Sequence, residues 1–166
     1  MHRRSNVRES LEQDASGATM TSSSLRALAL VALLGGLAPA ALAQEAFAVI
    51  AHPGVPGGQI KKETLAAVFL RQMTRWSDGS AIKPVDQSAR APLRASFSQQ
   101  ALGQSVASVT TYWSQQITSG KGPPPPVKTT DAEVIAYVKA NAGAIGYVAV
   151  GSLAEDSGVK VLKVVE

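Results

Sequence analysis

The sequence predicts an α/β fold in which a mostly parallel sheet is flanked by helices. Short apolar segments bounded by turn residues, such as residues 46–51 and 144–150, are typical of buried strands. Segments with apolar residues at helical spacing lie between them. The resulting order, β-α-β-α-α-α-β-β, favours one central sheet, because strands that alternate with helices pair side by side and are covered by those helices.

The first 43 residues have the pattern of a secretory signal peptide. Arg26 precedes an apolar run at residues 27–34, and an Ala-x-Ala site predicts cleavage after Ala43. Met20 begins this pattern, so Met20 is a candidate translation start and residues 1–19 a candidate upstream extension. The run is short and rich in alanine, which disfavours a membrane span, and an uncleaved anchor is the alternative. We therefore expect an exported protein, in the periplasm or an equivalent location.

Residues 44–166 have the size of a single domain. They contain 12 Lys and Arg against 9 Asp and Glu, a mild positive excess. The excess is spread along the chain, which argues against nucleic-acid binding. The chain has no cysteine, which excludes disulfides, thiolate metal sites and a lipid-modified cysteine at the cleavage point.

The first strand of this domain, residues 46–51, ends at a turn that contains His52. This histidine is either a ligand or a base, or else a plain turn residue, and the turn role is favoured because the mature chain has no second histidine. Residues 61–70 follow as an amphipathic helix with a poor N-cap. Its apolar stripe consists of Leu65, Val68 and Phe69.

A loop at residues 71–79 separates this helix from the next strand, at residues 82–85. Trp76 in the loop either stacks on a ligand or packs the loop onto the domain, and packing is favoured. Pro84 indicates an edge position or a strand start, because proline cannot donate a backbone hydrogen bond to a neighbouring strand.

Three helices and two strands are expected in the remaining chain. Pro92 suits the first position of a helix, where its missing N–H would be unpaired in any case. Ser105 caps a second helix. Its predicted stripe consists of Val106, Val109, Trp113 and Ile117. After a stiff connector at residues 119–126, Thr130 and Glu133 form a capping box that opens the third helix. The strands are residues 144–150 and 159–165.

Residues 85–97 are the first candidate for a functional site. They read as a strand end, a polar turn and a helix start. A helix N-terminus at the end of a strand presents free N–H groups and the positive end of the helix dipole, which together favour anions. Ser88, Arg90 and Arg94 lie around it in sequence. The alternative is a routine strand-to-helix connection with solvated arginines.

Catalytic motifs are missing from the sequence. It contains no G-x-S-x-G, Walker loop, dinucleotide fingerprint or H-E-x-x-H. Its acidic residues are few and scattered, which disfavours paired-carboxylate chemistry. We therefore expect no enzymatic activity, and no cofactor or metal.

Residues 64–70 read TLAAVFL, residues 74–85 read TRWSDGSAIKPV, and residues 142–148 read AGAIGYV. The first two segments resemble the "la-x-IF-x-G-x-x-x-x-W-x-DG-x-x-I-x-x-V" run, and the third the "pGAIGYV" strand, of the phosphate ABC-transporter substrate-binding proteins (PstS-like proteins). The resemblance implies a type 2 periplasmic-binding fold, in which two α/β lobes hold an anion between them and deliver it to a membrane permease. This chain matches one lobe.

The family's anion loop, R-x-D-x-S-G-T, falls on residues 87–93. Its Arg and Asp are replaced by Gln87 and Ala89, and its S-G-T by Ala91-Pro92-Leu93. No side-chain ligand of that motif is retained, and Pro92 removes one backbone donor. The candidate anion-binding residues at this helix start are therefore Ser88, Arg90, Leu93 and Arg94.

Two functions follow from these observations. The first is an exported single-lobe protein that binds phosphate or another small anion weakly and serves an ABC permease or an envelope sensor. The alternative is a periplasmic interaction module without a ligand, which docks a membrane transport or sensing partner or a second copy of itself as a homodimer.

Overall fold

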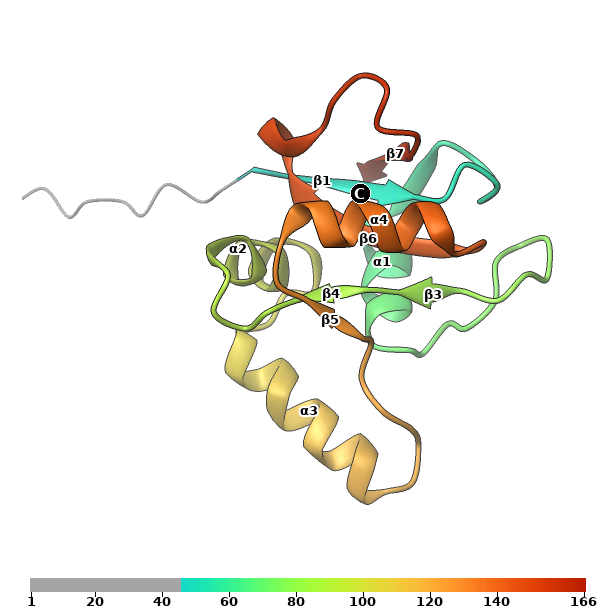
Figure 1. The fold of residues 1–166 in the computed structure, drawn as a ribbon. Helices are drawn as coiled ribbons and strands as arrows, with labels where there is room; N and C mark the ends of the chain where they lie inside the picture. The colour runs from blue at the N-terminus through green and yellow to red at the C-terminus, as the bar shows by residue number, and fades with distance from the viewer. Residues whose placement is uncertain (1–45) are drawn as a thin grey trace, which may run out of the picture. The chain divides into compact units, whose positions relative to one another are not determined.

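The computed structural model describes residues 46–166, which form a sheet with helices on both faces (Figure 1). In chain order the elements are β1 (Phe47–Ala51), β2 (Gln59–Lys61), α1 (Lys62–Phe69), β3 (Lys83–Pro84), β4 (Asp86–Gln87), α2 (Pro92–Ala101), α3 (Val106–Thr118), β5 (Val127–Lys128), α4 (Asp131–Ala140), β6 (Ala144–Ala149), the short 3-10 helix η1 (Val150–Ser152) and β7 (Lys160–Val165). The predicted signal peptide, residues 1–43, lies outside the described residues. Within 46–166, no helix is long and apolar enough to cross a membrane.

The α/β class is confirmed, but the sheet is mixed rather than mostly parallel. Its five strands have the order β2-β7-β1-β6-β3. The central strand β1 runs antiparallel to both β6 and β7, whereas β2 pairs with β7 and β3 pairs with β6 in parallel. Apolar periodicity identifies a strand without encoding its direction, because direction depends on the path of the connecting chain.

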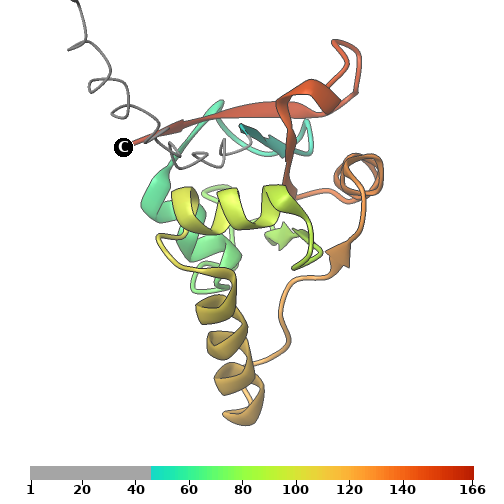
Figure 2. The ribbon, with the colours of Figure 1, turned by 90° about the vertical axis from the view of Figure 1, so that its left-hand side faces the viewer.

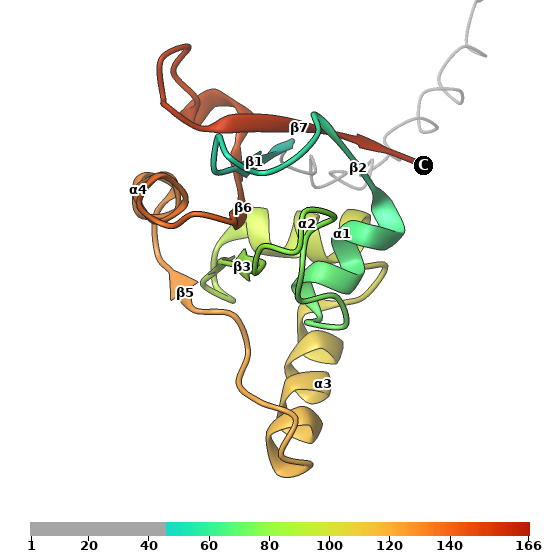
Figure 3. The ribbon, with the colours of Figure 1, turned by 90° about the vertical axis from the view of Figure 1, so that its right-hand side faces the viewer.

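The two faces of the sheet carry separate apolar cores. Figure 3 shows the helices that cover them, α4 on one side of β6 and α1 and α2 on the other. Successive residues of a strand point to opposite faces. Val49 of β1 and Ile145 of β6 accordingly pack with α1 and α2, while Ile50 and Val148 pack with α4 on the other face. The predicted stripe of α1 is confirmed, since Leu65, Val68 and Phe69 are buried in the first core.

An aromatic cluster fixes α2 against β6. The ring of Phe97 stacks on Tyr147 with centroids 3.7 Å apart and the planes nearly parallel. Phe69 and Phe47 pack edge-on against Phe97 at 4.7 and 5.2 Å. Aromatic pairs in such geometries contribute about 0.5–1.5 kcal/mol each beyond the area that they bury. This packing sets the position of the Tyr147 hydroxyl, which reaches toward β4.

The predicted caps are present in the structure. Thr130 and Glu133 form the full capping box of α4, and the side chain of Ser105 accepts a hydrogen bond from the N–H of Ser108. Pro92 occupies the start of α2, and α1 lacks a side-chain cap as its sequence predicts.

The predicted stripe of α3 is only partly buried. Val109 and Trp113 are buried, but Ile117 is 57% exposed. Figure 2 shows the reason: α3 extends away from the sheet, so that its C-terminal turns have no layer to pack against. Periodicity marks an apolar face but does not say whether another element covers its whole length.

Three short strands, β2, β4 and β5, were not predicted from the sequence. Of these, β4 and β5 pair in parallel, with Asp86 opposite Val127 and Gln87 opposite Lys128. The N–H groups of Asp86 and Ser88 donate to the carbonyls of Pro126 and Lys128, both at 2.9 Å. This pairing anchors the segment that leads into α2, and therefore the candidate site.

Candidate functional site

The predicted site is a turn between β4 and α2. The carbonyl of Ser88 accepts a hydrogen bond from the N–H of Ala91 at 2.9 Å, and the Ser88 hydroxyl lies 3.4 Å from the N–H of Arg90. The turn thus brings Ser88 and Arg90 together, directly before Pro92. The turn leads directly into α2, whose N-cap residue, Ala91, provides no side-chain hydrogen bond.

The N-terminus of α2 has a free N–H group among the described residues and no acidic side chain in its first turn. The N-cap residue Ala91 makes no side-chain hydrogen bond to it. The N–H of Leu93 has no hydrogen-bond partner among residues 46–166, whereas that of Arg94 donates to the carbonyl of Ala91 at 3.0 Å. Uncapped N–H groups and the helix dipole favour a negative charge at such a position.

The four predicted residues lie in different environments. Arg90 is exposed and Ser88 is half-buried, so both face solvent at the turn. The side chain of Leu93 is buried in the core with Phe97, which leaves only its backbone for a ligand. Arg94 is 5% exposed, an unusual burial for an arginine.

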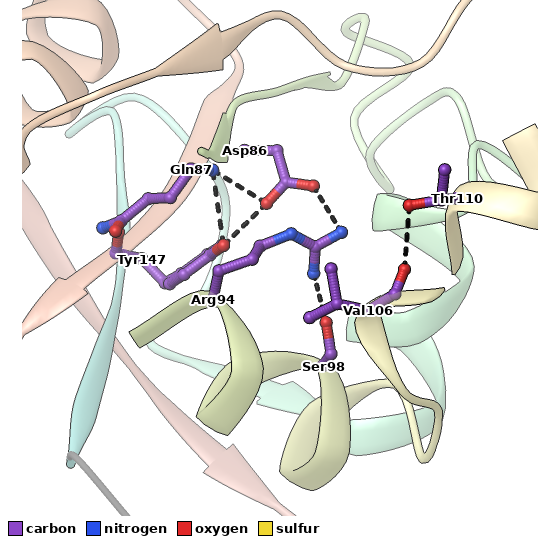
Figure 4. A network of polar contacts seen from close by, with 7 residues as sticks. All are labelled: Asp86, Gln87, Arg94, Ser98, Val106, Thr110 and Tyr147. Atoms are coloured by element: carbon purple, nitrogen blue, oxygen red, sulfur yellow. Dashed lines mark hydrogen bonds and ion pairs between the residues drawn. The ribbon is translucent and has the colours of Figure 1, made fainter. Parts of the chain in front are cut away.

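A buried ion pair accounts for the burial of Arg94 (Figure 4). Its Nη2 lies 2.8 Å from Oδ2 of Asp86, and its Nη1 donates to the hydroxyl of Ser98 one turn further along α2. Buried charges are tolerated when they are paired and hydrogen-bonded in this way. The positive charge of Arg94 is therefore balanced inside the fold by Asp86.

The second oxygen of Asp86 is also satisfied. Oδ1 accepts hydrogen bonds from the Tyr147 hydroxyl at 2.6 Å and from the N–H of Gln87 at 2.8 Å. Burial raises the pKa of the Asp86 carboxyl, and Arg94, Tyr147 and the Gln87 N–H oppose that rise. Burial and the Asp86 charge hold the pKa of Tyr147 well above its usual value, so its hydroxyl stays protonated and donates.

Gln87 extends the network to the other face of the sheet. Its Nε2 donates to Oδ1 of Asp131 at 2.7 Å and to the carbonyl of Tyr147 at 3.0 Å. The second oxygen of Asp131 accepts from the N–H of Ala149 at 3.0 Å and from the hydroxyl of Ser152 at 2.5 Å. Gln87 thus has a structural role that joins β4 to α4 and β6.

A groove of about 270 Å³ lies between this network and α3. One wall contains Asp86, Gln87, Ala89 and Arg94. The other walls are formed by α3 and the connector, with Val106, Val109, Thr110, Trp113, Ser114, Ile117, Pro124, Pro125 and Val127. The groove is mainly apolar, and the buried ion pair of Asp86 and Arg94 lies in its lining.

Two other candidates have structural roles. Nδ1 of His52 accepts a hydrogen bond from the N–H of Gly54 at 3.0 Å, as expected for a turn histidine. The indole N–H of Trp76 donates to the carbonyl of Gly143 at 3.0 Å, so this side chain packs its loop onto the domain. In the part of the chain that the structure describes, no group of three or more acidic, histidine or cysteine side chains could hold a metal ion.

Sequence reasoning did not single out Asp86, Tyr147 or Ser98. Asp86 carries a weak signal, since it is an acidic residue that directly follows an apolar strand and precedes Arg94 by eight positions. Tyr147 lies inside the GAIGYV segment, where periodicity predicts only burial. Nothing in their spacing indicates that the three side chains meet.

Comparisons with known proteins agree with the fold. Residues 5–165 match the model of a family described as "PBP superfamily domain". No curated protein matches the sequence significantly. The structure is similar to an ABC-type phosphate transport receptor from Vibrio cholerae, with a TM-score of 0.56 and 19% identity over 72% of this chain and 46% of the receptor.

Two further solved structures give the same result. PstS from Borrelia burgdorferi has a TM-score of 0.56 and 16% identity, over 72% of this chain and 47% of that one. A protein from Clostridium perfringens with bound phosphate has a TM-score of 0.56 and 18% identity, over 72% and 45%. This chain therefore spans less than half the length of these proteins, and the similarity is one of fold. Because the family model covers almost the whole sequence and the fold agrees with it, the chain belongs to the PBP superfamily domain family.

Proposed function

We propose that residues 44–166 form an exported, single-lobe binding protein that takes phosphate or another small anion at the turn between β4 and α2. The observation that carries this proposal is the open N-terminus of α2, with no side-chain cap and no acidic residue in its first turn. A helix end of this kind attracts an anion through its free N–H groups and its dipole. The phosphate receptors that share the fold support the choice of ligand.

The anion would contact four residues. The N–H of Leu93 offers a hydrogen bond, and the Ser88 hydroxyl offers a second from the turn. The exposed Arg90 contributes a positive charge that makes no ion pair with another described residue. Arg94 contributes less, since Asp86 balances its charge. With one free arginine and an open lobe, we expect weak binding, in the millimolar to high micromolar range.

The location and partner follow from the same proposal. The predicted signal peptide supports export, and the similarity to ABC-type phosphate transport receptors supports a permease or an envelope sensor as the partner. A binding role rather than catalysis agrees with the family and with the lack of catalytic motifs in the sequence.

Titration calorimetry of residues 44–166 with inorganic phosphate tests the proposal. We expect saturable binding that weakens about tenfold in Arg90→Gln, because the variant removes one charge next to the anion. Arg75→Gln is the matched control. Arg75 is equally exposed, but it donates to the carbonyl of Gly79 in a separate loop, so its loss should leave binding unchanged. The absence of heat with phosphate, sulfate and related oxyanions would remove the ligand from the proposal.

A second function, a ligand-free interaction module, is favoured by the surface of α3. Residues 106–118 contain no charged side chain, although much of the helix faces solvent. Ile117 and Val127, which both line the groove, are 57% and 55% exposed. Exposed apolar surface of this kind is typical of a docking face.

Pull-down from envelope extract, together with light scattering, distinguishes this alternative. A module that docks a membrane partner or a second copy should recover a stable partner or run as a dimer, and Ile117→Asp should abolish the interaction. A monomer that recovers no partner contradicts this function.

A further inference from the structure

We propose that Asp86 is an internal competitor for the anion: its carboxylate occupies the guanidinium of Arg94 and thereby lowers the affinity of the site. This inference rests on the proposed anion-binding function, and it concerns a residue that neither the family motif nor the sequence pattern assigns. It predicts that removal of one carboxylate creates a tighter anion site from residues that are already in place.

The contacts of Arg94 show the competition directly (Figure 4). Nη2 lies 2.8 Å from the Asp86 carboxylate, and Nη1 donates to Ser98. A guanidinium binds carboxylate and phosphate oxygens through the same N–H groups. The Asp86 oxygen therefore takes the place that an oxyanion ligand would need.

The carboxylate is held there from two other elements. Tyr147 of β6 and the N–H of Gln87 in β4 both donate to its Oδ1. Asp86 consequently cannot rotate away from Arg94 without losing both hydrogen bonds. The neighbourhood of the α2 N-terminus then offers an anion almost no net charge beyond that of Arg90.

The pair is also next to free space. Asp86 and Arg94 both line the groove of about 270 Å³ that separates β4 and α2 from α3. The guanidinium extends along α2 to Ser98, one turn beyond Arg94. Without the carboxylate, an oxyanion in the groove would meet a buried guanidinium that has lost its counter-charge.

A contribution to the free energy of unfolding does not explain the ion pair of Asp86 and Arg94 well. The cost of removing both charges from water often cancels their attraction, so a neutral pair of similar volume is commonly tolerated. A neutral double variant, Asp86→Asn with Arg94→Gln, should therefore fold, and it serves as the matched control for a single variant that frees Arg94.

The test compares inorganic phosphate binding by the wild type, Asp86→Asn and the double variant D86N/R94Q at neutral pH, with circular dichroism as the check of folding. A single neighbouring charge changes a charge-dependent equilibrium by about 1–3 log units at 4–6 Å. We therefore expect D86N to bind phosphate about tenfold to a thousandfold more tightly than the wild type. The gain should vanish in D86N/R94Q.

The outcomes separate this inference from the proposed function. If the wild type shows no phosphate binding and D86N binds phosphate through Arg94, the inference is supported and anion binding by the native chain is overturned. A folded D86N that binds no tighter than the wild type overturns the inference, and wild-type binding then leaves the proposed function standing. A gain that persists in D86N/R94Q also overturns it, because the gain would not run through Arg94.

A second measurement covers a folding failure of D86N, in which Arg94 loses its only ion-pair partner among the described residues. Phosphate that pairs with the freed guanidinium should raise the melting temperature of D86N and leave that of D86N/R94Q unchanged. A melting temperature of D86N that does not respond to phosphate overturns the inference.

Discussion

The hydroxyl of Tyr147 is the point at which the sheet holds the Asp86 carboxylate, and its removal gives a direct measure of the buried network. Tyr147→Phe keeps the ring that stacks on Phe97 at 3.7 Å and deletes the hydroxyl, which donates to Oδ1 of Asp86 at 2.6 Å and accepts from the Gln87 N–H at 3.3 Å. Hydrogen bonds to charged groups contribute about 1.5–3 kcal/mol net, so we expect a loss of about 2 kcal/mol in the free energy of unfolding.

Urea denaturation of residues 44–166, followed by circular dichroism, measures this loss. With a slope of about 1.3 kcal/mol per molar urea, the midpoint should fall by about 1.5 M. Tyr137→Phe is the control, because the Tyr137 hydroxyl makes no hydrogen bond to another described residue, and its change should stay within about 0.5 kcal/mol. Equal effects of the two substitutions would refute the network, since they would mean that water replaces the Tyr147 hydroxyl at no cost.

Two further predictions concern backbone geometry and pH. Gly143→Ala should lower the melting temperature by about 10 °C or more, because Gly143 has φ +79° and a Cβ there would lie 2.1 Å from the carbonyl oxygen of Ala81. Gly58→Ala, which meets no atom within 4 Å, is the control, and similar shifts for both would contradict the steric reasoning. Because burial raises the folded pKa of Asp86, its contribution to stability is present below its unfolded pKa and is lost as pH rises through the folded value. The stability advantage of the wild type over D86N, from urea titrations between acid and neutral pH, should thus shrink as pH rises; an advantage that grows would mean that attraction to Arg94 outweighs burial.

Local features of this fold could be predicted from the sequence because their causes are local. The capping box of Thr130 and Glu133, the Ser105 cap and the helix start at Pro92 each depend on residues within one turn. The buried strands β1 and β6 are recognisable from short apolar runs between turn residues. The three segments that resemble phosphate ABC-transporter substrate-binding proteins predicted the fold of this chain, and the family model and the similar solved structures agree with that prediction.

The remaining features depend on contacts between distant residues. The antiparallel placement of β1 between β6 and β7 and the two-residue strands β4 and β5 leave no periodic signal. The exposure of Ile117 reflects the absence of a covering layer over the described part of α3, which its own sequence cannot reveal.

The candidate site also combines features with local causes and features that depend on distant residues. The sequence located the turn and the open helix end, because both follow from Pro92 and its neighbours. It did not reveal that Arg94 is paired with Asp86, since the two are eight positions apart and the pairing requires Tyr147, 61 positions from Asp86, to hold the carboxylate. Arginine beside a helix start reads as a free charge unless its partner is known.

Amide-resolved NMR during a phosphate titration of residues 44–166 tests the central claim most directly. Anion binding at the start of α2 predicts a saturable shift of the Leu93 N–H, accompanied by Arg90 and Ser88, while the Gly54 N–H that donates to His52 stays in place. A Leu93 amide that does not move at saturating phosphate, or shifts that spread evenly over the surface, would contradict the account.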